Sequence, residues 1–378
     1  MSANQASIDV GKVVEGITRW VEIESPTSDK AAVNRMLDRV QEDLAGLPVK
    51  IERMPGRESF ADILAVRTAG AGDRPGILVM SHIDTVHPVG TLAGPLPVRR
   101  DGDKLYGPGI YDMKGGAYLA MDAFRRAVGG GTARLPITYL FTPDEEVGSP
   151  TSRAVIEAEA RHARHVLVTE PARDGGKVVT ARKGVGRFQV TAAGVPAHSG
   201  ARHQDGRSAI KEMARQVLAV EAMTDYGRGI TTSIGKISGG TADNVIPEHC
   251  RMSVDLRVRD ADTGREMEAK IRELKAVDSD VKLTVTGQMN RPPFEKTPAI
   301  EGLLRHAQGL ARELGFELAD SAMTGGGSDG NFTAFLGIAT LDGLGIDGDG
   351  AHTHHEHGLI SSIEPRLKLM QRLFETLE

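Results

Sequence analysis

The chain has 378 residues, of which 40% are hydrophobic and 26% charged, and its formal net charge is -5 at pH 7. This length exceeds what one hydrophobic core usually organises, so we expect two domains. The mildly acidic balance argues against a nucleic-acid partner, and no apolar stretch approaches the roughly 20 residues of a membrane span. Because Cys250 is the single cysteine, a disulfide within the chain and a cysteine-based zinc site are excluded.

The first half of the chain alternates between helical and strand patterns. A helix with one buried face is expected over residues 28–44, after a polar start that can cap it. Short apolar runs at 76–80, 136–141 and 165–169 are separated by helix-like segments. This alternation predicts an α/β domain with a mainly parallel central sheet flanked by helices.

The pattern changes near residue 184, where half-exposed strands and an amphipathic helix indicate an inserted α+β domain. The α/β pattern resumes after the prolines at 292 and 293. We therefore expect a discontinuous domain made of residues 1–183 and 290–378, interrupted by a second domain over 184–289. Residues 1–24 lack the features of a secretory signal, and the lone cysteine favours the cytoplasm.

Polar residues follow directly on the apolar runs. His82 and Asp84 come after the first run, spaced so that both side chains can lie on one side of an extended backbone. The carboxyl ends of strands are where ligands bind in open α/β sheets, so His82 can reach a metal while Asp84 fixes its tautomer. A structural histidine bonded to a neighbouring carboxylate would give the same pattern.

Acidic residues occupy the corresponding positions elsewhere. Glu145 and Glu146 follow the second run, and Glu170 follows the third. Adjacent acids at the end of a buried strand are costly unless a cation neutralises them, although a solvated turn is the alternative. If the backbone is extended, one of the adjacent glutamates can bind metal and the other can move protons.

Two loops supply further candidates. Asp112 lies in a glycine-rich loop before a helix, where it could bind a metal or simply cap that helix. The segment GDGAHTHHEHGLI contains four histidines, and the metalloprotease pattern HExxH fails in it because Leu359 stands where the second histidine should be. The sequence thus excludes a site of the thermolysin kind.

Eight motifs in order along the chain resemble the M20 metallopeptidase family, in particular its glutamate carboxypeptidase branch and its deacetylase and desuccinylase members. They are SHIDTV, YGPGIYDMKGG, TPDEEVGS, TEP, GVPAHSG, NVIP, GGGSDGN and AHTHHE, and they span nearly the whole sequence. The resemblance implies two Zn²⁺ ions per subunit, with Co²⁺ or Mn²⁺ as substitutes. It also implies that the insert is a ferredoxin-like lid and dimerisation domain, so we expect a homodimer formed through residues 184–289.

The resemblance further implies a role for each motif residue. Asp112 bridges the ions, His82 and Glu170 hold one, and Glu146 and His352 hold the other. Glu145 is the general base and Asp84 orients His82. His198 donates to the oxyanion, from the neighbouring subunit in dimeric members. The resemblance gives substrate-binding roles to Asn244 and Arg257, although Arg257 in an alternating strand could equally face solvent. Gly326, Gly327 and Ser328 could let backbone amides approach the substrate, although the glycines could equally serve only a tight turn.

The histidine-rich THHEH departs from the family's pattern. His352 is preferred because Glu356 then follows four positions later, as the resemblance implies, but His354 or His355 could replace it if the loop is shifted. The expected activity is cleavage of an amide or peptide bond that releases an amino acid. Two alternatives stay open: an amidohydrolase that degrades an aromatic or xenobiotic amide, and a catalytically silent, metal-dependent dimeric binding protein. A fold and a metal centre do not by themselves fix the substrate.

Overall fold

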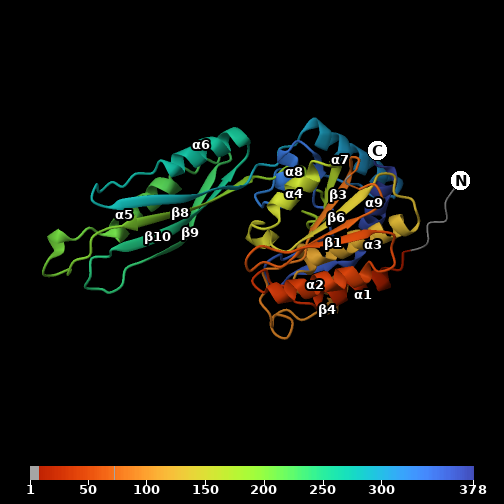
Figure 1. Ribbon diagram of the computed structural model, residues 1–378, viewed down its shortest axis with the longest axis horizontal. Helices are drawn as coiled ribbons and strands as arrows, with labels where there is room; N and C mark the ends of the chain where they lie inside the picture. The colour runs from red at the N-terminus through yellow and green to blue at the C-terminus, as the bar shows by residue number, and fades with distance from the viewer. Residues whose placement is uncertain (1–7, 72) are drawn as a thin grey trace. The chain divides into compact units, whose positions relative to one another are not determined.

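The computed structural model describes residues 8–71 and 73–378, so the first seven positions of the segment inspected for a secretory signal lie outside it. The described chain divides into two compact units, drawn in Figure 1. The first contains the chain up to Ala181 together with Lys296–Thr324 and Ser328–Glu378, and the second contains Arg182–Glu295 and Gly325–Gly327. The second unit thus runs beyond residue 289, because the backbone of Phe294 pairs with that of Arg182.

The first unit is an α/β structure. Its helices are α1 (Val10–Val21), α2 (Lys30–Asp43), α3 (Gly115–Gly129), α4 (Arg153–Ala160), α7 (Pro298–Glu313), α8 (Gly330–Phe335) and α9 (Ile363–Thr376). Its strands are β1 (Lys50–Met54), β2 (Ile63–Arg67), β3 (Gly76–His82), β4 (Arg99–Asp101), β5 (Lys104–Tyr106), β6 (Ile137–Thr142), β7 (Ala163–Val168), β12 (Ala339–Leu341), β13 (Gly348–Asp349) and β14 (His357–Leu359). The expected helix over 28–44 is confirmed as α2, and the three apolar runs are β3, β6 and β7.

The large sheet of this unit is mixed. Its strand order is β1-β2-β6-β3-β7-β12, and a smaller sheet has the order β13-β14-β5-β4. In the large sheet β6, β3, β7 and β12 are parallel, whereas β2 is antiparallel to both β1 and β6. The sequence predicts parallel strands throughout most of this sheet, and the antiparallel edge is the difference. A short link joins β1 to β2, and such a link allows antiparallel pairing but no crossover helix.

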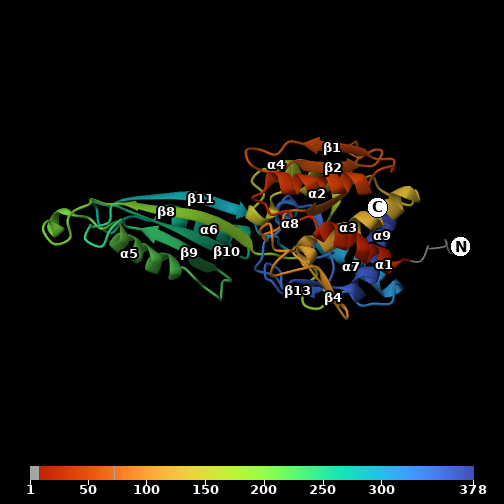
Figure 2. The same ribbon diagram turned by 90° about the horizontal axis from the view of Figure 1, so that it is seen from below.

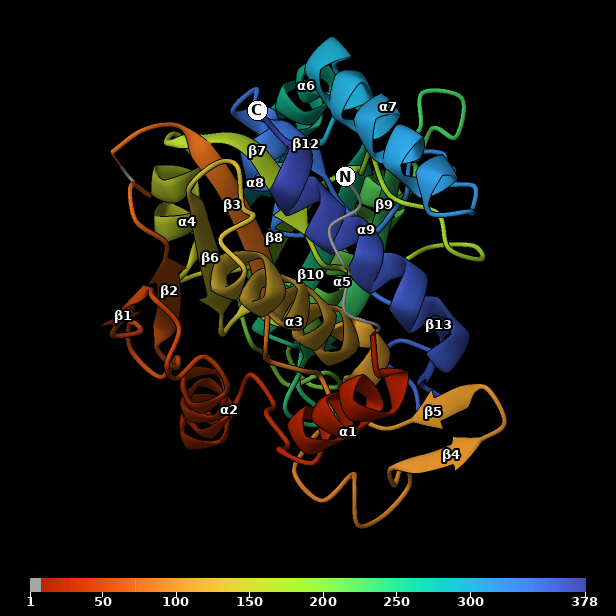
Figure 3. The ribbon, with the colours of Figure 1, turned by 90° about the vertical axis from the view of Figure 1, so that its right-hand side faces the viewer.

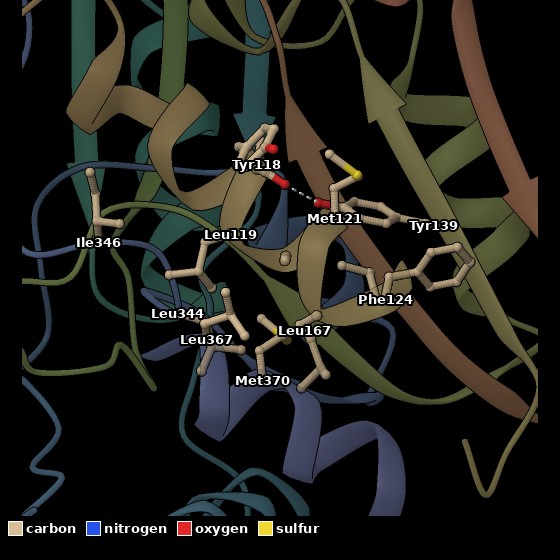
Figure 4. Close-up of a cluster of buried hydrophobic side chains, with 14 of the residues drawn as sticks. Tyr118, Leu119, Met121, Phe124, Tyr139, Leu167, Leu344, Ile346, Leu367 and Met370 are labelled. Atoms are coloured by element: carbon tan, nitrogen blue, oxygen red, sulfur yellow. Dashed lines mark hydrogen bonds between the residues drawn. The ribbon is translucent and has the colours of Figure 1, made fainter. Parts of the chain in front are cut away.

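Helices cover both faces of the large sheet. On one face α1, α2, α3, α7 and α9 pack on the strands in a single core, and on the other face α4 and α8 pack on the alternate strand residues. Figure 3 shows α3 and α9 side by side on one face of the sheet. In the close-up of Figure 4, the Tyr139 hydroxyl donates to the carbonyl oxygen of Ala117 over 2.9 Å. Because both faces are covered, β3 and β6 are buried along their whole length.

The second unit is a four-stranded antiparallel sheet with two helices. Its elements in chain order are β8 (Gly184–Ala193), α5 (Ala209–Glu221), β9 (Thr231–Gly239), β10 (His249–Val258), α6 (Ala261–Arg272) and β11 (Lys282–Arg291). The strand order is β11-β8-β10-β9 (Figure 2). Residues of α5 and α6 share one apolar core with alternate residues of β8 and β10, so both helices lie on the same face. An inserted α+β unit is therefore present, and its service as a lid or dimerisation domain stays a prediction.

Among helices in the described ranges, none combines the length and apolar character that a membrane crossing requires.

Candidate metal centre

Three neighbouring strands bring their terminal residues to one edge of the large sheet. His82 is the last residue of β3, Glu145 and Glu146 follow β6, and Glu170 follows β7. Because β6, β3 and β7 are adjacent and parallel, their carboxyl ends meet. The Nε2 atom of His82 lies 3.7 Å from Oε1 of Glu170. Residues that are far apart in the sequence thus converge at this edge.

Asp112 reaches the same place from the loop before α3. It lies in the irregular turn Ile110–Lys114, and α3 begins only at Gly115, so the alternative that Asp112 caps this helix is wrong. A Cβ on Gly116 would lie 2.2 Å from the carbonyl oxygen of Thr169. The glycine at this position therefore lets the start of α3, which the turn of Asp112 leads into, approach the end of β7.

The two carboxylate oxygens of Asp112 face two different histidines. Its Oδ1 lies 3.1 Å from Nε2 of His82, and its Oδ2 lies 3.4 Å from Nε2 of His352. The Nε2 atom of His352 is also 3.1 Å from Oε2 of Glu146. Asp112 thus stands between a pair made by His82 and Glu170 and a pair made by His352 and Glu146.

The carboxylates raise the pKa values of both histidines. Hydrogen bonds to Asp112 and Glu146 raise the pKa of His352 to about 11. Burial alone would lower the pKa of His82, but the carboxylates of Asp112 and Asp84 outweigh it, and the pKa lies well above its usual value. Burial raises the pKa of Glu146. These directions indicate an excess of negative charge, which a bound cation would neutralise.

The donor atoms fit a metal ion. Ligand atoms of His82, Asp112 and Glu146 lie within 4.8 Å of one another, as do those of His82, Glu145 and Glu170. The Oε1 atom of Glu146 is buried and has no hydrogen-bond partner among the described residues, which is costly for a carboxylate unless a cation contacts it. Imidazole nitrogens with carboxylate oxygens are the mixture that zinc accepts.

Asp84 supports two of the strand ends. Its fully buried carboxylate accepts hydrogen bonds from the Thr27 hydroxyl (2.7 Å) and from the amides of Glu145 (3.2 Å) and Glu146 (3.3 Å). Nδ1 of His82 lies 3.0 Å from the main-chain oxygen of Asp84 and 3.4 Å from its Oδ1. The main-chain oxygen and Oδ1 of Asp84 therefore both help to fix the ring of His82.

The extended backbone considered for the adjacent glutamates is wrong. Glu145–Val147 form a short 3-10 helix, closed by Gly148 at a φ of 96°. The amides of this turn donate to Asp84 rather than to a neighbouring strand. The two glutamate side chains consequently leave a turn, and both belong to the groups of potential ligands around His82.

Two supporting residues lie within the motifs, but sequence spacing does not reveal their partners. Buried Glu356 accepts hydrogen bonds from the amide of Asp112 and from His87, and Asp329 accepts from the hydroxyls of Thr142 and Ser149. Their partners are distant in the sequence, so only the folded chain identifies them.

The four histidines near the end of the chain divide clearly. His352 adopts a φ of 64° and contacts Asp112 and Glu146. Among the described residues, neither His354 nor His355 forms an ion pair with these carboxylates. The geometry therefore favours His352, in agreement with the motif register.

His198 and Asn244 lie next to each other in the second unit. The amide of Ser199 donates to the main-chain oxygen of Asn244 over 2.9 Å. Nδ1 of His198 accepts hydrogen bonds from the amides of Gly200 (3.1 Å) and Ala201 (3.2 Å). A neutral His198 consequently carries its proton on Nε2, and this exposed side chain can donate to a ligand.

The remaining predicted substrate residues already have partners. Arg257 forms a two-point ion pair with Asp255, with distances of 2.6 and 2.9 Å. The Gly326 carbonyl accepts from Arg182, and a Cβ on Gly327 would lie 2.7 Å from Cδ of Arg291.

Ser328 is fully buried in the first unit. Its hydroxyl donates to Asp342 over 2.6 Å and its amide to Asn331 over 2.9 Å. Its role in substrate binding, like those of Arg257 and the two glycines, stays a prediction.

Known proteins resemble this chain over nearly its full length. The profile of peptidase family M20/M25/M40 matches residues 78–376. Carboxypeptidase G2 from Pseudomonas sp. (strain RS-16) is 31% identical, over 97% of this chain and 89% of that protein. Succinyl-diaminopimelate desuccinylase from Delftia acidovorans is 27% identical, over 95% of this chain and 96% of that protein.

The fold matches as well. The crystal structure of an M20 family metallo-carboxypeptidase from Sulfolobus solfataricus superposes with a TM-score of 0.73 at 15% identity, and the match covers 96% of this chain and 98% of that one. Fold, donor atoms and relatives together define a metal-dependent amide hydrolase. The chain belongs to peptidase family M20/M25/M40.

Proposed function

We propose that this protein binds two zinc ions and cleaves an amide or peptide bond to release an amino acid. His82 and Glu170 would hold one ion and Glu146 and His352 the other, with Asp112 shared between them. The observation that carries the proposal is the placement of Asp112, whose two oxygens face the two different histidines at 3.1 and 3.4 Å. Co²⁺ or Mn²⁺ could replace zinc, since the donors are nitrogen and oxygen.

Glu145 is the general base of the proposed reaction. The bound zinc ions supply Lewis acidity that polarises the carbonyl group and makes water more acidic. Glu145 takes a proton from the attacking water and returns it to the departing amine. Its position beside His82 and Glu170 supports this role, because the three residues offer ligand atoms within 4.8 Å of one another. Asp84 keeps His82 and the Glu145 turn in place.

The second unit would act as a ferredoxin-like lid and form a homodimer. Its βαββαβ order supports the first part of this proposal. His198 would donate from Nε2 to the oxyanion of the partner's substrate, which the proton position on its ring permits. A His198→Ala subunit mixed with a Glu145→Gln subunit should then recover partial activity. Absence of recovery in proven mixed dimers would show that each subunit works alone.

The substrate proposed is a peptide or N-acyl amino acid of the glutamate carboxypeptidase type. The relative named carboxypeptidase G2 supports the choice, since it aligns over 97% of this chain. Asn244, Arg257, Gly326, Gly327 and Ser328 would bind the carboxylate and polar groups of that substrate. Arg257 would have to exchange Asp255 for the substrate, since an arginine fork binds one carboxylate in the two-point manner. The lone cysteine suits work in the cytoplasm.

A substrate panel tests the function. Zinc-loaded protein should hydrolyse members of an N-acyl amino acid and dipeptide panel, and chelator treatment or Glu145→Gln should stop turnover. Hydrolysis confined to aromatic or xenobiotic amides without an amino-acid product would select the degradative amidohydrolase instead. Binding of zinc without any turnover would favour the catalytically silent protein.

A further inference from the structure

Glu356 is a buried carboxylate that contacts three separate parts of the metal centre. The residue is fully buried. Oε1 accepts hydrogen bonds from the amides of Tyr111 (2.9 Å) and Asp112 (3.0 Å). Oε2 lies 3.0 Å from the amide of Gly109 and 2.6 Å from Nε2 of His87. Four donors therefore surround a single carboxylate.

These contacts join the three segments that carry the histidines and the shared aspartate. Glu356 itself lies four positions after His352. Its amide partners are Asp112 and two close neighbours in the loop of Asp112, and its imidazole partner His87 belongs to the segment that continues from His82. The side chain of Asp112 must point to His82 and His352 at once, so the orientation of its backbone decides whether both contacts form.

We propose that Glu356 is a positioning residue that fixes the backbone of Asp112 and thereby sets the metal affinity of the centre. The inference rests on the proposed metal-binding function. Glu356 does not belong to either group of potential ligands among the described residues. Its effect passes through the amide of Asp112, which donates to Oε1 of Glu356 over 3.0 Å. Partners of ligands commonly change metal affinity by about 10- to 100-fold when they are replaced.

Glu356→Gln tests the role with little change in size. The amide side chain can keep one acceptor oxygen, but it presents hydrogen atoms to two of the four donors. The affinity for zinc, measured by competition with a chromogenic chelator, should fall about 10-fold or more relative to the wild-type protein. Turnover should recover when the zinc concentration is raised, because the residues that act on the substrate are intact.

Glu212→Gln is the matched control. Glu212 is also a buried carboxylate that accepts hydrogen bonds from a distant loop, through the amides of Val277 (2.9 Å) and Asp278 (3.2 Å). It lies in the second unit and touches no metal-centre residue among the contacts of the described chain. Its replacement should lower the melting temperature and leave zinc affinity unchanged.

The outcomes separate this inference from the function on which it rests. Wild-type zinc affinity in folded Glu356→Gln would overturn the positioning role, as would an equal loss in Glu212→Gln. Failure of the wild-type protein to bind zinc would instead overturn the proposed function. If Glu356→Gln does not fold, His87→Phe removes one donor and should lower zinc affinity in the same direction by a smaller factor. Unchanged affinity in that variant would also refute the role.

Discussion

Replacing Asp84 with asparagine should weaken both the fold and the metal centre. The side chain is fully buried, and its Oδ2 accepts from Thr27 and Glu146 while Oδ1 accepts from Glu145. An asparagine can place its one carbonyl oxygen on only one of these sides. On the other side its NH₂ group then faces a backbone amide. Both groups are donors, so that backbone amide loses its hydrogen bond.

The structure sets the expected size of the effect. Hydrogen bonds to a charged group contribute about 1.5–3 kcal/mol each. The loss of one such bond, with two donors left facing each other, should therefore lower the free energy of unfolding of the metal-free protein by about 3 kcal/mol. For a unit of this size that corresponds to a fall in melting temperature of about 6–12 °C. Since Asp84 holds His82 and the Glu145 turn, zinc affinity should also fall about 10- to 100-fold.

The assay compares melting temperature in chelator with zinc affinity from chelator competition. Asp342→Asn is the control, because Asp342 is equally buried and accepts from Ser328 (2.6 Å) and the amide of Gly343 (2.5 Å). The Asp342→Asn variant should have a lower melting temperature and keep its zinc affinity. Wild-type zinc affinity in Asp84→Asn would refute the claim that this carboxylate supports the metal centre.

Three further predictions concern the proposed ligands and base. Glu145→Gln should lower turnover by about 10²-fold or more while zinc content stays at the wild-type level, because a general base is lost and no ligand is. His352→Ala should lose zinc by elemental analysis, whereas His354→Ala should keep it, since His352 contacts Glu146 and, among the described residues, His354 forms no ion pair with it. Zinc uptake at pH 7 should release protons, because the pKa of His352 is raised to about 11 and that of His82 is also raised, and zinc affinity should weaken as the pH falls. The pKa of His352 is higher in the folded chain than in the unfolded chain. Protonated His352 therefore stabilises the metal-free fold fully below about pH 6.5, and this stabilisation declines towards pH 11.

Each of these three has a decisive contrary result. Turnover near the wild-type rate in Glu145→Gln would remove Glu145 from the role of base. Full zinc retention in His352→Ala would reassign that ligand to another histidine. The third prediction is contradicted if calorimetry of zinc binding, in buffers of different ionisation enthalpy, shows no proton release. Both histidines would then already be neutral in the metal-free protein.

Much of the site could be predicted because it depends on strand ends. His82, Glu145, Glu146 and Glu170 each follow an apolar run, and parallel strands place such positions together. The antiparallel edge formed by β1 and β2 could not be predicted in the same way, because pairing direction leaves no mark in a short apolar run. The 3-10 turn at Glu145 depends on Asp84, which is distant in the sequence.

The contacts that hold the proposed ligands in place were the least accessible to sequence reasoning. Glu356 ends the motif AHTHHE, but its function as an acceptor depends on amides at Gly109, Tyr111 and Asp112 that are more than 240 positions away. A backbone amide donates whatever its side chain is, so no sequence motif identifies these donors. Among the histidines near the end of the chain, distances to Glu146 and Asp112 distinguish His352 where spacing alone left three choices.

The separation of Glu356 from the loop that it holds also bears on the order in which the protein is built. During synthesis β3, which ends in His82, and β7, which Glu170 follows, emerge long before the segment that contains His352 and Glu356. Contacts between such distant segments carry the largest loop-closure cost, so they form late. The centre can be complete only once the segment that contains His352 and Glu356 has left the ribosome. Full metal loading is therefore delayed until this segment has packed into the first unit.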